Sequence, residues 1–141
     1  DCGQNVFIQG FLEKKNLLDL MRNFIVFEAD NGTVIKKVCR YQQFRAVNKA
    51  IDRIVNGKDK LTRGGVVWHT QGSGKTALAA FSNRVIKDYF GHKKVVNTRF
   101  FFVVDRLDLL RQAKTEFENR GFYLSSLNVY QGIIKICSMD G

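Results

Sequence analysis

The chain of 141 residues contains no proline, and none of its apolar runs reaches the roughly 18 to 20 residues that a membrane span needs. Its N-terminus also lacks a charged leader followed by an apolar segment. Without proline there is no obvious stiff linker, and neither an internal repeat nor a low-complexity tract is visible. These absences argue against a membrane partner and predict a cytoplasmic globular protein.

Cysteine is also scarce. Cys2, Cys39 and Cys137 are far apart, show no paired metal-binding spacing, and leave one thiol unmatched if two were joined. We therefore expect reduced thiols. Hydrophobic residues at 45% and charged residues at 26% are typical of a folded domain with one modest core. The chain begins with Asp1 and ends soon after a motif that should open a longer domain, so we expect a fragment.

Positive charge is abundant and local. The net charge is +10, and residues 36–63 carry nine Lys or Arg against only Asp52 and Asp59. This stretch is a candidate surface for a polyanion. A solvated basic helix face explains the same charges equally well, and composition does not separate the two interpretations.

The residue pattern in the first part of the chain predicts two helices and a hairpin. Asn16 is a plausible N-cap for a short apolar helix that ends near Phe24. Apolar residues then flank Asn31-Gly32, a dipeptide that favours a tight hairpin turn. A second, amphipathic helix is expected before Gly57, from the apolar residues Phe44, Val47, Ile51, Ile54 and Val55.

The second part of the chain alternates predicted strands and helices. We expect a buried strand at 66–68, a helix at 75–90 stopped by Gly91, a central parallel strand at 100–104, and a helix at 107–119 stopped by Gly121. Such βαβα order predicts an α/β fold with a parallel sheet and right-handed crossovers. Beyond residue 122 the pattern is short and ambiguous.

A glycine-rich loop lies between the predicted strand at 66–68 and the helix that follows it. The amides of Gly72, Ser73, Gly74 and Lys75 can cradle a polyphosphate at the positive end of that helix. Lys75 is the expected catalytic cation on the β- and γ-phosphates of ATP, and the hydroxyl of Thr76 is the expected ligand of Mg²⁺. The full phosphate-loop pattern has glycine where this chain has His69, which we interpret as a residue that shapes the loop.

Upstream of the loop, Gln43 is a candidate for selecting the nucleotide base. A glutamine amide can donate and accept at once, and this matches N7 and N6 of adenine. An unremarkable glutamine on a polar helix face remains the alternative.

Three segments together resemble the restriction (R) subunit of type I restriction-modification enzymes. They are R-Y-Q-Q-F-R-A-V-N-K-A-I at 40–51, G-G-V-V-W-H-T-Q-G-S-G-K-T at 64–76, and the Asp105-Arg106 pair with Leu109 and Gln112. The W-H-T-Q-G-S-G-K string is unusually specific to that family. The resemblance covers roughly residues 16–120.

The resemblance implies a superfamily 2 motor that uses ATP and Mg²⁺ to move along double-stranded DNA. It further implies a P-loop NTPase with a partial RecA-like sheet, preceded by a helix and a hairpin. Gln43 resembles the adenine-recognising glutamine and residues 72–76 resemble motif I. Arg106 and Gln112 belong to a segment like motif Ia, beside the DNA track, and are the candidate DNA-binding residues.

The resemblance also implies that further domains and subunits, outside this chain, contribute to the activity. Residues 1–38 would be a junction after a nuclease domain, and 39–141 the first part of the first motor domain. Methyltransferase and specificity subunits would be partners, and the parent would be an ATP-dependent site-specific endonuclease. The acidic pair that would hold Mg²⁺, the later arginine motifs and the nuclease residues are not recognisable, so we expect the fragment alone to be inactive.

Two other interpretations stay open at this point. One is the first motor lobe of a different superfamily 2 helicase or remodeller, against which the W-H-T-Q string argues. The other is a non-catalytic, basic nucleic-acid-binding fragment whose loop is vestigial. Titration with ATP and Mg²⁺ separates the last from the others.

Overall fold

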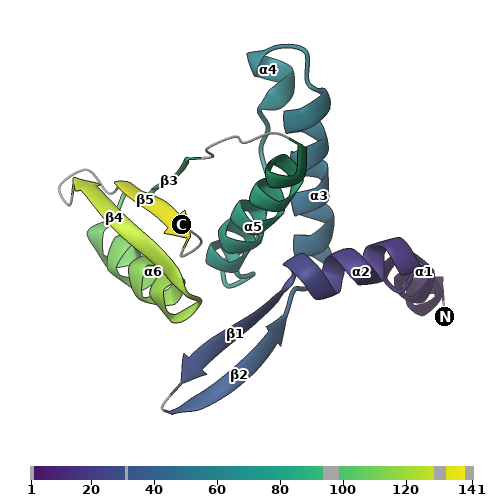
Figure 1. Ribbon diagram of the computed structural model, residues 1–141, viewed down its shortest axis with the longest axis horizontal. Coiled ribbons are helices and arrows are strands. Elements are labelled where there is room, and N and C mark those ends of the chain that lie inside the picture. The colour runs from purple at the N-terminus through teal and green to yellow at the C-terminus, as the bar shows by residue number, and fades with distance from the viewer. Residues whose placement is uncertain (1, 31, 94–98, 129–132, 139–141) are drawn as a thin grey trace. The chain divides into compact units, whose positions relative to one another are not determined.

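The computed structural model describes residues 2–30, 32–93, 99–128 and 133–138 (Figure 1). The chain divides into two compact units, residues 1–26 with 37–85 and residues 27–36 with 86–141. Its elements follow in the order α1 (Cys2–Phe11), α2 (Lys14–Asn23), β1 (Ile25–Asp30), β2 (Thr33–Val38), α3 (Tyr41–Asn56), α4 (Lys60–Arg63), α5 (Lys75–Lys93), β3 (Phe100–Val103), α6 (Leu107–Asn119), β4 (Phe122–Asn128) and β5 (Ile133–Ser138). No helix among these residues is both long and apolar enough to cross a membrane.

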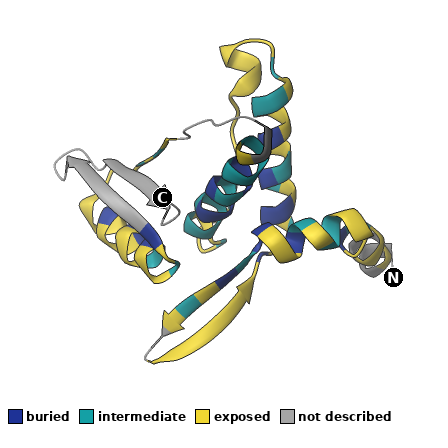
Figure 2. Ribbon diagram, viewed as in Figure 1, coloured by how far each residue is buried: buried dark blue, intermediate teal, exposed yellow. Residues whose placement is uncertain are grey.

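Phenylalanine rings form the core of the first unit. The ring centroid of Phe24 lies 4.8 Å from that of Phe44 and 5.5 Å from that of Phe81, and Phe11 lies 5.3 Å from Phe44. Burial of such rings is the largest stabilising contribution in a small core. Because the four rings come from α1, the C-cap of α2, α3 and α5, they fix the helices that carry the candidate site (Figure 2).

Helix α3 confirms the predicted amphipathic helix. Its buried face carries Phe44, Val47 and Ile51. The helix ends at Gly57, whose N–H donates to the Arg53 carbonyl oxygen at 2.9 Å. The short helix α4, which the sequence did not predict, follows at once. Its N-cap is Asp59, and the pKa of this carboxyl is lowered because the backbone N–H and the hydroxyl of Thr62 both donate to it.

The predicted hairpin is confirmed, whereas the predicted start of the preceding helix is wrong. Gly32 takes a φ of 82° between β1 and β2, and Asn31 lies outside the described residues. Helix α2 begins at Lys14 with Glu13 as its N-cap, so Asn16 is inside the helix. The Asn16 amide donates to the Gly10 carbonyl oxygen, which removes it from a capping role.

Helix α5 confirms the helix predicted after the glycine-rich loop and runs past its expected end. Gly91 lies within it, so the prediction that Gly91 stops the helix is wrong. A single glycine weakens a helix by only about 1 kcal/mol, which neighbouring turns can offset. The Arg84 guanidinium donates to the Ile25 carbonyl oxygen at 2.7 Å and ties α5 to the start of β1.

The three-stranded sheet of the second unit is antiparallel, which makes the prediction of a parallel sheet wrong for these residues. Its order is β3-β5-β4, and β5 pairs antiparallel with both neighbours. Strand β3 is therefore an edge strand with alternately exposed residues, not a central strand covered on both faces. An apolar run alone does not distinguish these two environments, because pairing depends on strands far along the chain.

The strand predicted at 66–68 is also absent. Residues 64–70 have no regular structure, and Val66 is 90% exposed. A strand forms only where a neighbouring strand pairs with its backbone. No described strand pairs with these residues.

Helix α6 packs against the sheet of the second unit through Phe117. Its ring centroid lies 5.4 Å from that of Phe102 in β3 and 6.1 Å from that of Phe122 in β4. The helix spans the predicted residues and ends before Gly121, which takes a φ of 78°. The positive φ explains why glycine suits the turn into β4.

Candidate nucleotide and DNA sites

The glycine-rich loop lies at the N-terminus of α5, as the sequence predicts. Gly72 and Gly74 take φ angles of 74° and 81°, a region that residues with a side chain rarely occupy. The Leu78 N–H donates to the Gly74 carbonyl oxygen at 3.0 Å, so helical hydrogen bonding starts within the loop. The Ser73 N–H donates to the Thr70 carbonyl oxygen at 3.3 Å. A helix of 19 residues with a glycine turn at its start has a positive dipole end, where proteins commonly hold phosphate.

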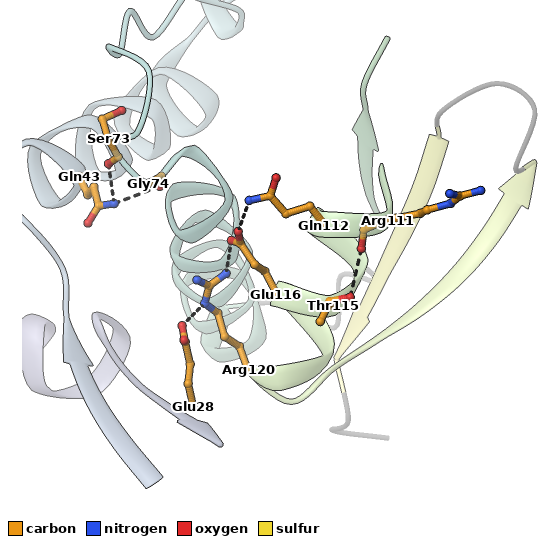
Figure 3. Close-up of polar contacts among 9 residues, drawn as sticks. All are labelled: Glu28, Gln43, Ser73, Gly74, Arg111, Gln112, Thr115, Glu116 and Arg120. Carbon is orange, nitrogen blue, oxygen red and sulfur yellow. Dashed lines mark hydrogen bonds and ion pairs between the residues drawn. The ribbon is translucent and has the colours of Figure 1, made fainter. Parts of the chain in front are cut away.

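Gln43 holds this loop against α3. Its amide nitrogen donates to the carbonyl oxygens of Ser73 at 3.2 Å and Gly74 at 3.0 Å (Figure 3). Its amide oxygen accepts from the Arg40 N–H at 2.8 Å, and the residue is only 5% exposed. Both ends of the side-chain amide are therefore engaged by the backbone.

The Gln43 amide also explains why position 74 needs glycine. A Cβ added to Gly74 would lie 2.6 Å from the Gln43 amide nitrogen, closer than real contacts allow. A side chain at this position would separate the loop from α3. The sequence shows both residues, but not that they touch.

Lys75 and Ser73 converge on one carbonyl group. The Lys75 ammonium donates to the Thr70 carbonyl oxygen at 3.1 Å, and the Ser73 hydroxyl donates to the same oxygen at 2.7 Å. Lys75 is exposed and Thr76 is half-buried in the first turn of α5. The ammonium can therefore exchange a single carbonyl for phosphate oxygens with little rearrangement.

A cavity of about 300 Å³ adjoins the loop. Residues of α3, its preceding turn, the 68–70 segment and the loop line it: Arg40, Gln42, Gln43, Trp68, His69, Thr70 and Ser73. His69 thus forms part of a cavity wall. Aromatic and amide side chains are suitable neighbours for a nucleotide base.

The loop residues fit a metal that arrives with a phosphate. No group of three or more His, Cys, Asp or Glu that could hold a metal ion occurs in the part of the chain that the structure describes. Mg²⁺ commonly keeps several waters and takes its other ligands from phosphates and one or two side chains. The Thr76 hydroxyl, at the start of α5, has the chemistry of one such ligand.

The two candidate DNA-binding residues are exposed and belong to the second unit. Arg106 precedes α6 and forms an ion pair with Asp108 at 3.4 Å, in which the two side chains are 68% and 76% exposed. Gln112 donates to the Glu116 carboxylate at 3.1 Å. Both contacts are on the surface, where such interactions are weak.

Gln112 lies at the end of a polar network that the sequence did not predict. Arg120 donates to Glu116 at 3.2 Å and to Glu28 of β1 at 2.6 Å (Figure 3). The i,i+4 spacing of Glu116 and Arg120 on α6 is a visible signal, but Glu28 is 92 residues from Arg120. Only the folded chain reveals that Glu28 belongs to the network.

The family model described as SWI2/SNF2 ATPase matches residues 42–131. A Methanocaldococcus jannaschii protein that carries the name MjaVIIP endonuclease subunit of a type I restriction enzyme is 40% identical over 72% of this chain and 10% of its own length. A second such protein of that organism, MjaVIIIP, is 35% identical over 94% of this chain and 13% of its own length. The HindI endonuclease subunit of a type I restriction enzyme of Haemophilus influenzae is 34% identical over 72% of this chain and 10% of its own length.

These relatives are much longer than this chain, which spans only 10 to 13% of their length. The resemblance to type I restriction endonuclease subunits that residues 40–51 and 64–76 indicate is thereby confirmed. No solved structure matches the chain.

Proposed function

The chain belongs to the SWI2/SNF2 ATPase family, and from this membership we propose that it forms part of the ATP-driven motor of a type I restriction subunit. The loop at residues 70–76 carries this proposal. It combines two glycines of positive φ, a lysine and a threonine at the first turn of a long helix. That combination binds the phosphates of nucleotides in many unrelated contexts.

In the proposed site, the loop amides and Lys75 hold the triphosphate of ATP. The Lys75 ammonium leaves the Thr70 carbonyl oxygen, which it contacts at 3.1 Å, and pairs with the β- and γ-phosphate oxygens. It neutralises charge that spreads over the transferring phosphoryl group. Mg²⁺ would be held by Thr76 and the phosphates, where it neutralises the same charge.

The base of the nucleotide would occupy the cavity lined by Trp68, His69 and Gln43. For Gln43 to read adenine directly, its amide has to exchange the carbonyls of Ser73 and Gly74 for the edge of the base. Binding of the base by Gln43 would thus be coupled to the conformation of the loop. The preference for adenine nucleotides is measured by comparing the rates of ATP and GTP hydrolysis in the wild type and in the variant Gln43→Ala.

The rest of the motor and its partners are part of the same proposal. Arg106 and Gln112 would contact double-stranded DNA, and the complete motor domain would contain a RecA-like parallel sheet. Residues 1–38 would join this motor to a nuclease domain. Methyltransferase and specificity subunits would assemble with the complete protein in the cytoplasm as a site-specific endonuclease.

The other motors of this family are a weaker alternative. The SWI2/SNF2 description is broader than restriction enzymes. All three relatives described above carry names of type I endonuclease subunits, and this favours the restriction subunit over a remodeller.

The decisive experiment is the substitution Lys75→Ala in the complete restriction subunit. DNA-dependent ATP hydrolysis should be abolished, because the cation that neutralises the transferring phosphate is removed. Lys58→Ala is the control, since Lys58 is an exposed lysine outside the loop. Undiminished turnover in the Lys75 variant contradicts the proposal, as does an absence of Mg²⁺-dependent ATP binding by the wild type.

A further inference from the structure

A second, larger cavity follows the exposed side of α3 in the first unit. This groove has a volume of about 550 Å³. One wall is formed by α3 and the other by residues 63–69, that is, the last residue of α4 and the segment that follows it. Its charged and aromatic lining residues are Tyr41, Arg45, Lys49, Arg53, Arg63 and Trp68.

The cations of the groove form a regular row. Arg45, Lys49 and Arg53 are all exposed and follow one another at four-residue intervals on α3. Four residues of helix rise about 6 Å, which is close to the distance between successive phosphates of an extended nucleic-acid strand. The row can therefore contact consecutive phosphates.

Backbone contacts, not carboxylates, hold Arg53 at the end of the row and Arg63 on the opposite wall. The Arg53 Nε donates to the Gly64 carbonyl oxygen at 2.8 Å, and the Arg63 Nε donates to the Gly57 carbonyl oxygen at 2.9 Å. Both guanidinium groups keep their terminal nitrogens for another acceptor.

Two acids lie near this row in the sequence, and each accepts a hydrogen bond from a neutral group. Asp52 accepts from the Asn56 side chain, and Asp59 accepts from Thr62. Among the described residues, no ion pair joins a carboxylate to Arg45, Lys49, Arg53 or Arg63, although the charge of Arg63 helps to lower the pKa of Asp59. The four cations of the groove outnumber these two nearby carboxylates, so its net charge is positive, which favours a polyanion.

Two aromatic side chains indicate which kind of polyanion the groove binds. The Trp68 indole is 91% exposed at the wall opposite the cationic row, and Tyr41 is half-buried at the start of α3. Exposed aromatic faces bind unpaired bases by stacking, whereas a duplex keeps its base faces covered. Cations in a row with aromatic rings beside them are the arrangement that binds single strands without reading sequence.

We propose that the groove between α3 and residues 63–69 binds single-stranded DNA. Arg45, Lys49 and Arg53 contact successive phosphates, Arg63 adds a cation from the opposite wall, and a base stacks on Trp68. The groove shares Trp68 with the smaller cavity proposed for the nucleotide base, but its phosphate contacts differ from those proposed for ATP and from the duplex contacts proposed for Arg106. It does not require phosphate at Lys75.

Trp68 is itself the probe, because it is the chain's single tryptophan. Titration of the 141-residue chain with a short oligothymidine should quench tryptophan fluorescence to saturation, since a stacked base quenches an indole. A duplex of equal length should bind more weakly without this quenching. Inorganic polyphosphate, which has charge but no bases, should compete with the oligothymidine and leave the emission of Trp68 in its own complex unchanged.

The variant Arg45→Gln/Lys49→Gln tests the phosphate row. The Kd for oligothymidine should rise about tenfold, and the slope of log Kd against log salt should fall by about 1.4, for two lost phosphate contacts. Lys58→Gln/Lys60→Gln removes the same charge from the same basic stretch outside the groove and should have a much smaller effect. Equal losses in the two variants would overturn the proposal.

Two further variants complete the test. Trp68→Leu should weaken binding of labelled oligothymidine, followed by fluorescence anisotropy, about tenfold. Lys75→Ala should leave this binding unchanged, so that failure of the nucleotide site and failure of the groove are distinguishable. Tighter binding of the duplex, or markedly tighter binding of oligouridine, would overturn the assignment to single-stranded DNA.

Discussion

Gln43 connects two parts of the candidate site that are distant in sequence. Its amide nitrogen donates to two carbonyls of the loop, and its amide oxygen accepts from the backbone of Arg40. A buried amide with all these partners stabilises the loop, whereas a buried amide that loses them costs about 1–3 kcal/mol.

The substitution Gln43→Glu should therefore destabilise the chain by about 1–3 kcal/mol. A carboxylate keeps the acceptor for the Arg40 N–H but has no donor for the carbonyl oxygens of Ser73 and Gly74. Urea unfolding of the 141-residue chain measures the change. The matched control is Gln42→Glu, at the exposed neighbouring position, and an equally large loss there would contradict the role of Gln43.

At this scale the sequence predicts which residues form the loop but not what holds it. The types and spacing of Gly72, Gly74 and Lys75 are visible in the sequence because their geometry is local. The contact between Gln43 and Gly74 joins residues 31 positions apart, and nothing in either residue type indicates it. Long-range polar contacts depend on the packing of α3 against the loop, which single-sequence patterns do not specify.

At the scale of elements, helices are better predicted than strands. The helices α3, α5 and α6 were each predicted from their apolar periodicity, which is a property of one segment. A strand, in contrast, forms only where another strand pairs with its backbone. The apolar runs at 66–68 and 100–104 look alike in sequence, but only the second has a neighbour to pair with, and that neighbour is β5. The ambiguous segment after residue 122 proved to contain both partners of the sheet.

The ion pairs of Arg120 connect α6 to β1 within the second unit. The Arg120 and Glu28 side chains are only 8% and 12% exposed. Arg120→Ala should destabilise the chain by about 3 kcal/mol, because it removes the buried cation that pairs with the poorly solvated Glu28 carboxylate and with the partly exposed Glu116 carboxylate. Thermal unfolding measures the loss.

A matched control for Arg120 lies on the same helix. Lys114 pairs with Glu118 at 3.8 Å, and both side chains are about half exposed. Lys114→Ala should change stability by less than about 0.5 kcal/mol, since solvent screens exposed pairs. If the two variants lose equal stability, burial is not what gives the Arg120 network its strength.

At the scale of the whole molecule, a net charge of +10 makes all DNA binding sensitive to salt. In the complete restriction subunit, Arg106→Ala should lower affinity by a similar factor on unrelated duplexes and reduce the salt slope by about one unit at most. Contacts with phosphates carry no sequence information. A loss that depends on DNA sequence would indicate base contacts instead.

The ion pair of Arg106 provides the control. Because the pair with Asp108 is exposed, its loss should barely change the melting temperature. Asp108→Ala should strengthen DNA binding slightly, since it frees the guanidinium. Unchanged DNA affinity in both variants would mean that Arg106 only interacts with the start of α6.

The order of strands in the second unit also constrains how the chain folds during synthesis. The last strand in sequence, β5, is the middle strand of the sheet and pairs with both β3 and β4. A ribosome therefore releases β3 and β4 before their shared partner exists. Until residues 133–138 emerge, the apolar residues 100–103 remain an unpaired edge on the nascent chain. Chaperone binding during translation should concentrate on that interval.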